Sequence, residues 1–361
     1  MRKINIAVIC LSCLAATAQA DNLTKPLPVN AVGRVVQERA GEKNAAPTYL
    51  YSWPGVYFES AFEGTSVDVR LNDDENILNL IVDDQAPIVL TKPGKTVYAI
   101  KNLSPGTHKI RLEKRTETQS TKGRFEGFYI SNDERASKVN AAELRIEFIG
   151  DSFTVGYGNT SSSRDCTNEQ VFETTNTQLG FPPRVAKYFK ADYQINASSG
   201  FGVVRNYNGT SPDKSLPKLY PYTLNDTSML YQEQWKPHII VIGLGTNDFS
   251  TQLKAEERWP NREALRADYI ETYKAFIKAL REKNPKAHFI LNASTKFDGE
   301  IKAQVEKVIA DLKASGETKI DGIFFDGLEY AGCHYHPSVK DDEVVANLLI
   351  EKIAANPKWW K

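Results

Sequence analysis

Cysteine is scarce in this chain, neither sign of charge is in excess, and no apolar run is long. Only four of the 361 residues are cysteine, and 45 basic side chains balance 45 acidic ones. Such a balance creates no field that would collect nucleic acid or an anionic membrane, so we expect neither as a partner. No apolar run approaches the roughly 20 residues that span a bilayer, so no membrane-spanning helix is expected.

The first residues have the organisation of a secretion signal. Arg2 and Lys3 precede an apolar stretch, and the small-residue site Ala18-Gln19-Ala20 follows it. We predict that residues 1–20 are a signal peptide and that the mature protein is secreted or periplasmic. The apolar stretch is too short for a membrane anchor, and the residues before Cys13 are a poor context for lipidation.

Removing that segment would leave two cysteines in the mature chain. Cys10 and Cys13 would be lost, and Cys166 and Cys333 would remain. In an oxidising compartment two remaining cysteines indicate one disulfide, whereas a metal site would need more ligands than this pair supplies. We therefore expect a Cys166–Cys333 disulfide, no metal and no cofactor. The alternative is two buried, unpaired thiols.

Two hydrophobic patterns follow one another along the mature chain. From about residue 31 to 132 apolar and polar residues alternate, as in "VDVRL" (67–71). This alternation is typical of an antiparallel β-sandwich, to which we assign residues 21–135. The next stretch, to residue 143, is polar and unpatterned, and we place the domain boundary there.

From residue 144 to 361 short apolar runs alternate with helical periodicity. The runs lie at residues 146–149, 193–196, 239–243, 288–291 and 320–325. Two apolar stripes with helical spacing separate the last three runs, one from Leu265 to Leu280 and one from Ile301 to Leu312. Strand–helix alternation of this kind predicts an α/β domain whose parallel sheet is covered on both faces.

Small or polar residues that suit ester chemistry follow four of these runs: Ser152, Gly200, Asn247 and His336. Because ligands bind beyond the carboxyl ends of parallel strands, the four are expected at one cleft. Ser152 can act there as a nucleophile and His336 as the base that takes its proton. The N–H groups of Ser152 and Gly200 and the amide of Asn247 can stabilise an oxyanion. The Gly-Asp-Ser turn on its own could equally be a helix N-cap.

The same residues resemble a known enzyme family. "GDS", the glycine of "SSGFG", "GTND" and "HPS" look like the four blocks of the SGNH (GDSL-type) hydrolases, in that order. Together with "WPGVYFESAFEGTSVDVRL" and "FIGDSFTVGYGN", they resemble carbohydrate esterase family 2 over nearly the whole mature chain. The resemblance implies a jelly-roll β-sandwich followed by a flavodoxin-like, three-layer SGNH domain. It also implies a secreted esterase that removes acetyl groups from plant polysaccharides such as xylan and glucomannan.

In one respect the chain departs from the SGNH pattern. These enzymes usually carry an aspartate two or three residues before the histidine, but this chain has Cys333 and His334 there. The resemblance therefore implies a Ser–His dyad in which a backbone carbonyl orients His336. The alternative is a carboxylate, Asp326 or Glu329, that reaches in from the preceding loop.

Other residues are weaker candidates for the site. A saccharide site offers flat rings to sugar faces, so Trp259, Trp359 and Trp360 are expected to bind substrate, with His334 beside them. The other histidines, at positions 108, 238 and 288, are expected to be packed or capping residues. If Ser152 and His336 meet, Cys166 and Cys333 also come to one rim of the cleft.

Two other functions remain as alternatives to the esterase. A non-catalytic carbohydrate-binding protein would also want a sandwich and exposed aromatic rings, but it would have no need of Ser152, Asn247 and His336 at three strand ends. An SGNH lipase or thioesterase would want an apolar acyl tunnel, whereas the loop "TSSSRDCTNEQ" (160–170) is polar. We expect an acetylated polysaccharide or oligosaccharide as the substrate, and a monomer.

Overall fold

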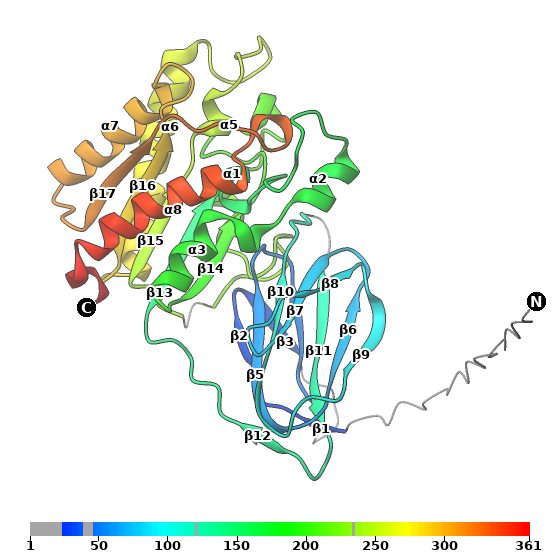
Figure 1. Cartoon of the computed structure of the whole chain (residues 1–361). Coiled ribbons are helices and arrows are strands. Elements are labelled where there is room, and N and C mark those ends of the chain that lie inside the picture. The colour runs from blue at the N-terminus through cyan, green and yellow to red at the C-terminus, as the bar shows by residue number, and fades with distance from the viewer. Residues whose placement is uncertain (1–23, 39–45, 120–121, 233–234) are drawn as a thin grey trace, which may run out of the picture.

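A sandwich of antiparallel strands precedes a parallel sheet with helices on both faces (Figure 1). The structure, a computed structural model, describes residues 24–38, 46–119, 122–232 and 235–361. The predicted signal peptide, residues 1–20, lies outside these ranges. Within them, no helix has both the length and the apolar character needed to cross a membrane.

The sandwich consists of two antiparallel six-stranded sheets, as predicted. The first has the order β3-β4-β11-β6-β9, with β1 paired to β11, and the second has the order β12-β5-β10-β7-β8, with β2 paired to β5. Alternate residues of β6, Val67, Val69 and Leu71, are fully buried between the sheets. The strands are β1 (Lys25–Pro26), β2 (Asn30–Val32), β3 (Val35–Glu38), β4 (Thr48–Tyr51), β5 (Tyr57–Gly64), β6 (Val67–Asp73), β7 (Ile77–Val82), β8 (Ile88–Thr91), β9 (Gly94–Ile100), β10 (Gly106–Lys114), β11 (Gly123–Ile130) and β12 (Arg135–Ser137).

The parallel sheet has the order β14-β13-β15-β16-β17, which is the flavodoxin-like order. All five predicted apolar runs form its strands. They are β13 (Arg145–Gly150), β14 (Asp192–Ala197), β15 (Ile239–Gly243), β16 (His288–Ser294) and β17 (Ile320–Phe325). The strand order reverses beside β13, because β14 and β15 pair with its opposite edges. A crevice opens at such a reversal, so the loops after β13, β14 and β15 are the ones that can build a site.

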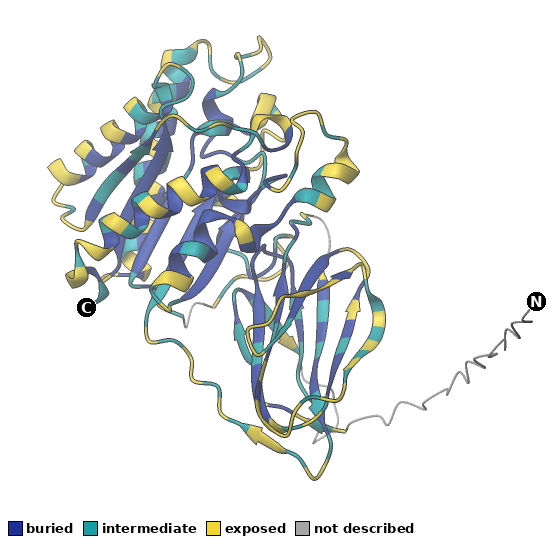
Figure 2. Ribbon diagram, viewed as in Figure 1, coloured by how far each residue is buried: buried dark blue, intermediate teal, exposed yellow. Residues whose placement is uncertain are grey.

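Helices cover both faces of this sheet. Helices α3 and α8 lie on one face, and α6 and α7 on the other (Figure 1). Both predicted apolar stripes face the sheet, and the outer sides of the helices are exposed (Figure 2). The helices are α1 (Ser152–Val155), α2 (Asn168–Thr174), α3 (Phe181–Tyr188), α4 (Leu216–Leu219), α5 (Thr246–Phe249), α6 (Arg262–Lys283), α7 (Glu300–Ala314) and α8 (Val339–Ala354), with 3₁₀ turns η1 (Thr177–Leu179), η2 (Tyr207–Gly209), η3 (Cys333–Tyr335) and η4 (Pro357–Trp360).

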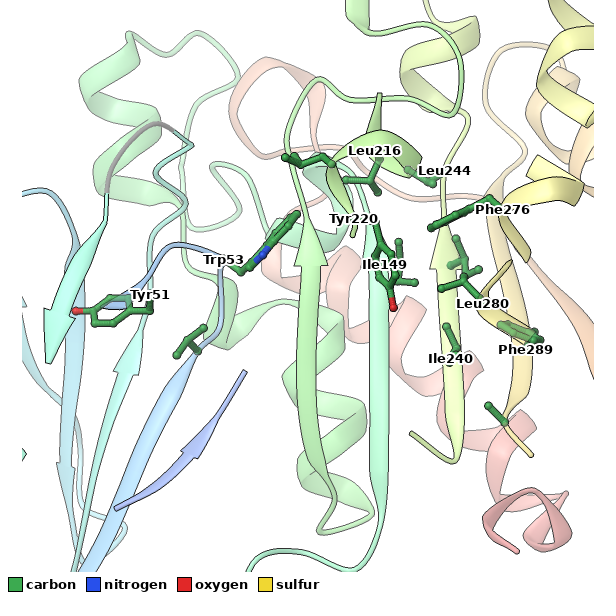
Figure 3. Close-up of a cluster of buried hydrophobic side chains, with 14 of the residues drawn as sticks. Tyr51, Trp53, Ile149, Leu216, Tyr220, Ile240, Leu244, Phe276, Leu280 and Phe289 are labelled. Atoms are coloured by element: carbon green, nitrogen blue, oxygen red, sulfur yellow. The ribbon is translucent and has the colours of Figure 1, made fainter. Parts of the chain in front are cut away.

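The sandwich and the parallel sheet share a buried boundary. Trp53 of the sandwich is fully buried in a hydrophobic cluster that continues to Ile149 and Tyr220 of the α/β part (Figure 3). Arg34, after β2, forms an ion pair with Glu147 of β13 at 3.3 Å, and their side chains are 1% and 2% exposed. Removing one partner of such a buried pair is strongly destabilising, because it leaves the other charge buried without its counter-ion. Glu147 also accepts hydrogen bonds from Asn196 Nδ2 and the Tyr220 hydroxyl.

Candidate active site

The candidate nucleophile lies on a tight strand-to-helix turn. Strand β13 ends at Gly150, and Ser152 is the first residue of the short helix α1. Asp151 caps this helix by accepting the N–H of Phe153 at 3.0 Å. Gly150 permits the turn, because a Cβ there would lie 1.9 Å from Thr154 Oγ1. The buried Ser152 hydroxyl is thus held at the carboxyl edge of the sheet, with its own N–H at a helix N-terminus.

His336 meets this serine from the loop between β17 and α8. Its Nε2 lies 2.9 Å from Ser152 Oγ, and its Nδ1 lies 2.9 Å from the carbonyl oxygen of Cys333. A carbonyl can only accept, so Nδ1 carries the proton and Nε2 is free to accept one from the serine. Asp326 is instead bonded to Thr295 and to its neighbour Gly327.

The surroundings of His336 keep its imidazole uncharged. Burial lowers the pKa of His336 to about 4, against the raising effect of the hydrogen bond to Cys333. The ring of Tyr157 lies 4.3 Å away, centroid to centroid, and Phe153 presents an edge at 5.7 Å. At neutral pH the imidazole is therefore available as a base.

Two further candidate donors flank Ser152. Gly200, after β14, has a φ of 82°, and a Cβ there would meet no heavy atom within 4 Å, so its backbone borders open space. Asn247, the second residue of α5 after β15, is buried and donates one N–H to the carbonyl of Phe201 at 2.8 Å. Its amide nitrogen also makes a long hydrogen bond, 3.4 Å to Asp151 Oδ2, and an oxyanion would have to replace this weaker acceptor to bind the amide.

Asp248, which sequence reasoning did not single out, holds the loop after Gly200. Its carboxylate accepts the backbone N–H groups of Val203, Val204 and Arg205 at 2.8–3.0 Å. Burial raises the pKa of Asp248 to about 6, although the three amide donors oppose that shift. The residue beside Asn247 thus ties the β15 loop to the β14 loop. Its place in "GTND" was the available signal, but an aspartate there is equally consistent with a plain helix turn.

The predicted disulfide between Cys166 and Cys333 is present and joins the loop that follows the Ser152 helix α1 to the loop that carries His336. Gly158 allows the loop after α1 to approach the loop that carries His336, because a Cβ at position 158 would lie 2.4 Å from Cys333 Cβ. His334 adds a polar bridge, with Nε2 2.8 Å from the carbonyl of Cys166 and Nδ1 3.0 Å from the Tyr157 hydroxyl. The carbonyl that orients the imidazole is therefore held by a covalent bond and by hydrogen bonds.

A cavity of about 980 Å³ opens over these residues. All four predicted strand-end residues line it: Ser152, Gly200, Asn247 and His336. So do His334 and two residues of the sandwich, Glu117 and Gln119. The aromatic side chains in its wall are Phe153, Tyr157, Phe172, Tyr207, Phe297 and Tyr335. The mixed polar and aromatic wall suits a ligand with both hydroxyl groups and flat apolar faces.

Comparisons with known proteins identify the family. Residues 32–139 match the family described as Carbohydrate esterase 2 N-terminal, and residues 148–337 match the GDSL-like Lipase/Acylhydrolase family. An acetylxylan esterase / glucomannan deacetylase of Cellvibrio japonicus (strain Ueda107) is 56% identical over 348 residues, 96% of each chain. The chain belongs to carbohydrate esterase family 2. It is a carboxylic ester hydrolase.

Solved structures share the fold of this family 2 esterase. One is a carbohydrate esterase whose active site displays divergent catalytic and non-catalytic binding functions. It has a TM-score of 0.89 and 55% identity, and the match covers 93% of this chain and 100% of that one. A family two carbohydrate esterase from Clostridium thermocellum, in complex with cellohexaose, has a TM-score of 0.78 and 27% identity, and the match covers 92% and 100%.

The three tryptophans expected to bind substrate do not line the cavity of the esterase. Trp359 is buried and stacks on His288 at 3.7 Å, at the start of β16. Trp360 packs against Phe189 and His238. Helix α8 explains both positions, because its 16 residues run back about 24 Å from the carboxyl edge of the sheet to the opposite edge.

Trp259 also lies outside the wall of the cavity. Its indole N–H donates to Asp268 at 2.9 Å, and Arg258 lies over its ring. This corrects the expectation that Trp259 offers its face to a sugar. The aromatic wall comes instead from tyrosines and phenylalanines on loops, such as Tyr157 and Tyr335, which lie inside or beside the recognised motifs and could have been noticed there.

The remaining histidines are packed away from the cavity, as expected. His108 bonds to Asp83 and to the carbonyl of Ser104 in the sandwich. His288 bonds to Asp321 at 2.9 Å. In the part of the chain that the structure describes, no three His, Cys, Asp or Glu side chains are grouped so that they could hold a metal ion.

Proposed function

We propose that this esterase is exported and removes O-acetyl groups from plant cell-wall polysaccharides, xylan and glucomannan, through an acetyl-enzyme on Ser152. The single observation that carries the mechanism is the contact of His336 Nε2 with Ser152 Oγ at 2.9 Å, with Nδ1 on a backbone carbonyl. The substrate is inferred from the acetylxylan esterase / glucomannan deacetylase that is 56% identical to this chain.

In the proposed first step His336 removes the hydroxyl proton of Ser152 as Oγ attacks the acetyl carbonyl. The oxyanion accepts hydrogen bonds from the N–H groups of Ser152 and Gly200 and from the amide of Asn247. The tetrahedral intermediate collapses when His336 Nε2 returns the proton to the leaving sugar hydroxyl. A water molecule, deprotonated by the same imidazole, then attacks the acetyl-serine. The C–Oγ bond breaks, acetate leaves, and His336 returns the proton to Ser152 Oγ.

The cavity wall supports a carbohydrate as the leaving group. The exposed rings of Tyr207 and Tyr335 in this wall can pack against a pyranose, and Asn168 offers an amide to its hydroxyl groups. The cellohexaose complex of a relative shows that a family member takes a linear chain of sugars. A lipase would instead need an apolar tunnel for its acyl chain.

Acetate release from polymers tests this proposal. We expect the purified enzyme to deacetylate acetylated xylan and glucomannan, to hydrolyse 4-nitrophenyl acetate, and to lose rate steeply on the butyrate and octanoate esters. Ser152→Ala should abolish all of these activities and leave the melting temperature nearly unchanged, because a turn serine contributes little packing. A faster rate on octanoate than on acetate would make the protein a lipase.

Export is tested separately from chemistry. We expect the mature protein to begin near Asp21 and to be recovered outside the cytoplasm, as residues 1–20 predict. Intact mass measurement of the protein from its natural host decides the cleavage point. An uncleaved chain would contradict this part of the proposal without affecting the esterase mechanism.

A further inference from the structure

The loop between β10 and β11 of the sandwich reaches into the active-site cavity of the other part. Glu117 and Gln119 of this loop line the cavity, and both contact Ser199, the residue before Gly200. Glu117 Oε1 accepts the backbone N–H of Ser199 at 2.7 Å, and Oε2 accepts its hydroxyl. Gln119 Nε2 donates to the Ser199 carbonyl at 2.7 Å and to Glu117 Oε1 at 3.1 Å.

These contacts act on the peptide that carries a candidate oxyanion donor. The carbonyl of Ser199 and the N–H of Gly200 belong to one planar peptide unit, so fixing one fixes the direction of the other. Gln119 holds that carbonyl, and Glu117 holds the N–H and side chain of the same residue. Gly200 itself has a left-handed φ of 82° and open space where a side chain would lie, and on its C-terminal side its carbonyl accepts the N–H of Tyr207 at 2.8 Å.

The rest of this loop is anchored from the α/β side. The Asp248 carboxylate accepts the N–H groups of residues 203–205, and Gly202 N–H donates to Asn206 Oδ1 at 3.1 Å. The N–H of Ser198 donates to Gly150 at the end of β13. Between these anchors, Ser199 is bonded to the sandwich through its carbonyl, its N–H and its hydroxyl, so on its N-terminal side the Gly200 amide is held by side chains from the preceding domain.

We propose that Glu117 is a positioning residue for catalysis, which aims the Gly200 N–H at the oxyanion, so that the sandwich completes the active site. This inference rests on the proposed acetyl-enzyme mechanism. A preorganised donor is worth most when it needs no reorientation during the reaction. Losing the carboxylate should therefore reduce transition-state stabilisation and leave substrate binding nearly intact.

The test compares wild type with Glu117→Gln, a variant of equal size whose neutral amide can accept from the N–H of Ser199 but can only donate to its hydroxyl oxygen, so both contacts lose the charge of the carboxylate. We expect kcat on 4-nitrophenyl acetate to fall about tenfold, less than the 10²–10³ that follows loss of a whole oxyanion donor, with KM changed less than about twofold. The dissociation constant of phenylboronic acid, which forms a tetrahedral adduct on a serine, should rise by the same factor. The dissociation constant of a deacetylated xylo-oligosaccharide should stay constant.

Two comparisons separate positioning from other roles. Thr118→Ala, in the same loop, removes a hydroxyl that bonds to Asn76 within the sandwich at 2.8 Å, and it should leave kcat unchanged. Ser199→Ala removes one partner of Glu117 and should give a smaller loss of kcat. Combined with Glu117→Gln it should cost less than the two separate losses together, because the two residues share an interaction.

Other outcomes overturn the proposal. An unchanged kcat in Glu117→Gln shows that the carboxylate of Glu117 does not position the donor, and an effect confined to KM and to oligosaccharide affinity makes Glu117 a binding residue. A higher kcat would mean that Glu117 acts by its charge, because the negative carboxylate repels the negative charge that develops on the oxyanion. If Glu117→Gln does not fold, a wild-type kcat in Ser199→Ala overturns the proposal. An inactive wild type refutes the proposed function. An active wild type with an inactive Ser152→Ala upholds that function, independently of the result for Glu117→Gln.

Discussion

Removing the Cys166–Cys333 disulfide should lower both the stability of the enzyme and its turnover. The bond links residues 167 positions apart, and a loop of that length gives a chain-entropy contribution of about 5 kcal/mol at 25 °C. Measured losses often fall short of this estimate, so we expect the free energy of unfolding to drop by about 2–5 kcal/mol in Cys166→Ser/Cys333→Ser.

The effect on turnover follows from the position of Cys333, which forms the disulfide through its side chain and contacts the proposed base, His336, through its carbonyl. Its carbonyl orients His336, and its loop would still be held by the Cys333 N–H on Gly158 at 3.2 Å and the His334 N–H on Arg164 at 2.7 Å. We therefore expect kcat to fall only about threefold to tenfold, far less than the ~10⁴ that follows loss of the correct tautomer.

Guanidinium unfolding and initial rates on 4-nitrophenyl acetate, both at 25 °C, measure the two effects. Cys166→Ser alone is the control, since it breaks the same bond while keeping the Cys333 side chain, and it should match the double variant. A stability change below about 1 kcal/mol would refute the loop-entropy reasoning. A wild-type kcat in both variants would show that the disulfide does not hold the base, and linked peptides must be found in an unreduced digest of the wild type.

Three further predictions concern Asn247, His336 and Trp359. Asn247→Ala should lower kcat by about 10²–10³, roughly 2.7–4 kcal/mol, with a smaller change in KM, because its amide serves charge that exists only in the transition state; an effect on KM alone would make it a binding residue. Since His336 must be neutral to accept a proton and its pKa is lowered to about 4, kcat/KM, followed by chromatographic measurement of released acetate, should stay level down to about pH 5 and fall through about pH 4; a midpoint near 6.5 would contradict the buried setting of the ring. Trp359→Ala should lower the free energy of unfolding by about 3 kcal/mol in a denaturant titration, through loss of the buried stack on His288, and leave kcat unchanged; a large loss of kcat would return Trp359 to the list of substrate-binding candidates.

Much of the fold could be predicted because its determinants are local. Each apolar run of the α/β part became a strand, and the stripe from Leu265 to Leu280 became the buried face of α6. The four strand-end residues could be grouped for a general reason: parallel strands end at one edge of a sheet, so short loops after them meet there. The absence of an aspartate at positions 333 and 334 left Asp326 and Glu329 open as partners of His336, and the backbone carbonyl was implied only by the resemblance to family 2.

The positions of the tryptophans were predicted wrongly, and Glu117 was not noticed, because both depend on packing between distant parts of the chain. The position of Trp359 depends on the length and direction of α8, which are not evident from the indole or its neighbours in sequence. Glu117 lies in a polar turn, "TETQ" (116–119), that resembles any hairpin connection. Its contact with Ser199 exists only because two separate parts of the chain pack together, and single-chain periodicity carries no information about such packing.

The shared boundary of the two parts also bears on how such a protein can change during evolution. Gly55 of the sandwich has a φ of 72°, and a Cβ there would lie 2.6 Å from Ile195 Cδ1 of β14. Glu147 would face that boundary without the guanidinium of Arg34 if the sandwich were exchanged for another module. A gene rearrangement that moved the hydrolase without the sandwich would therefore have to replace both the apolar cover of Ile195 and the cation beside Glu147, whereas exchanges in the loops around the cavity leave this boundary intact.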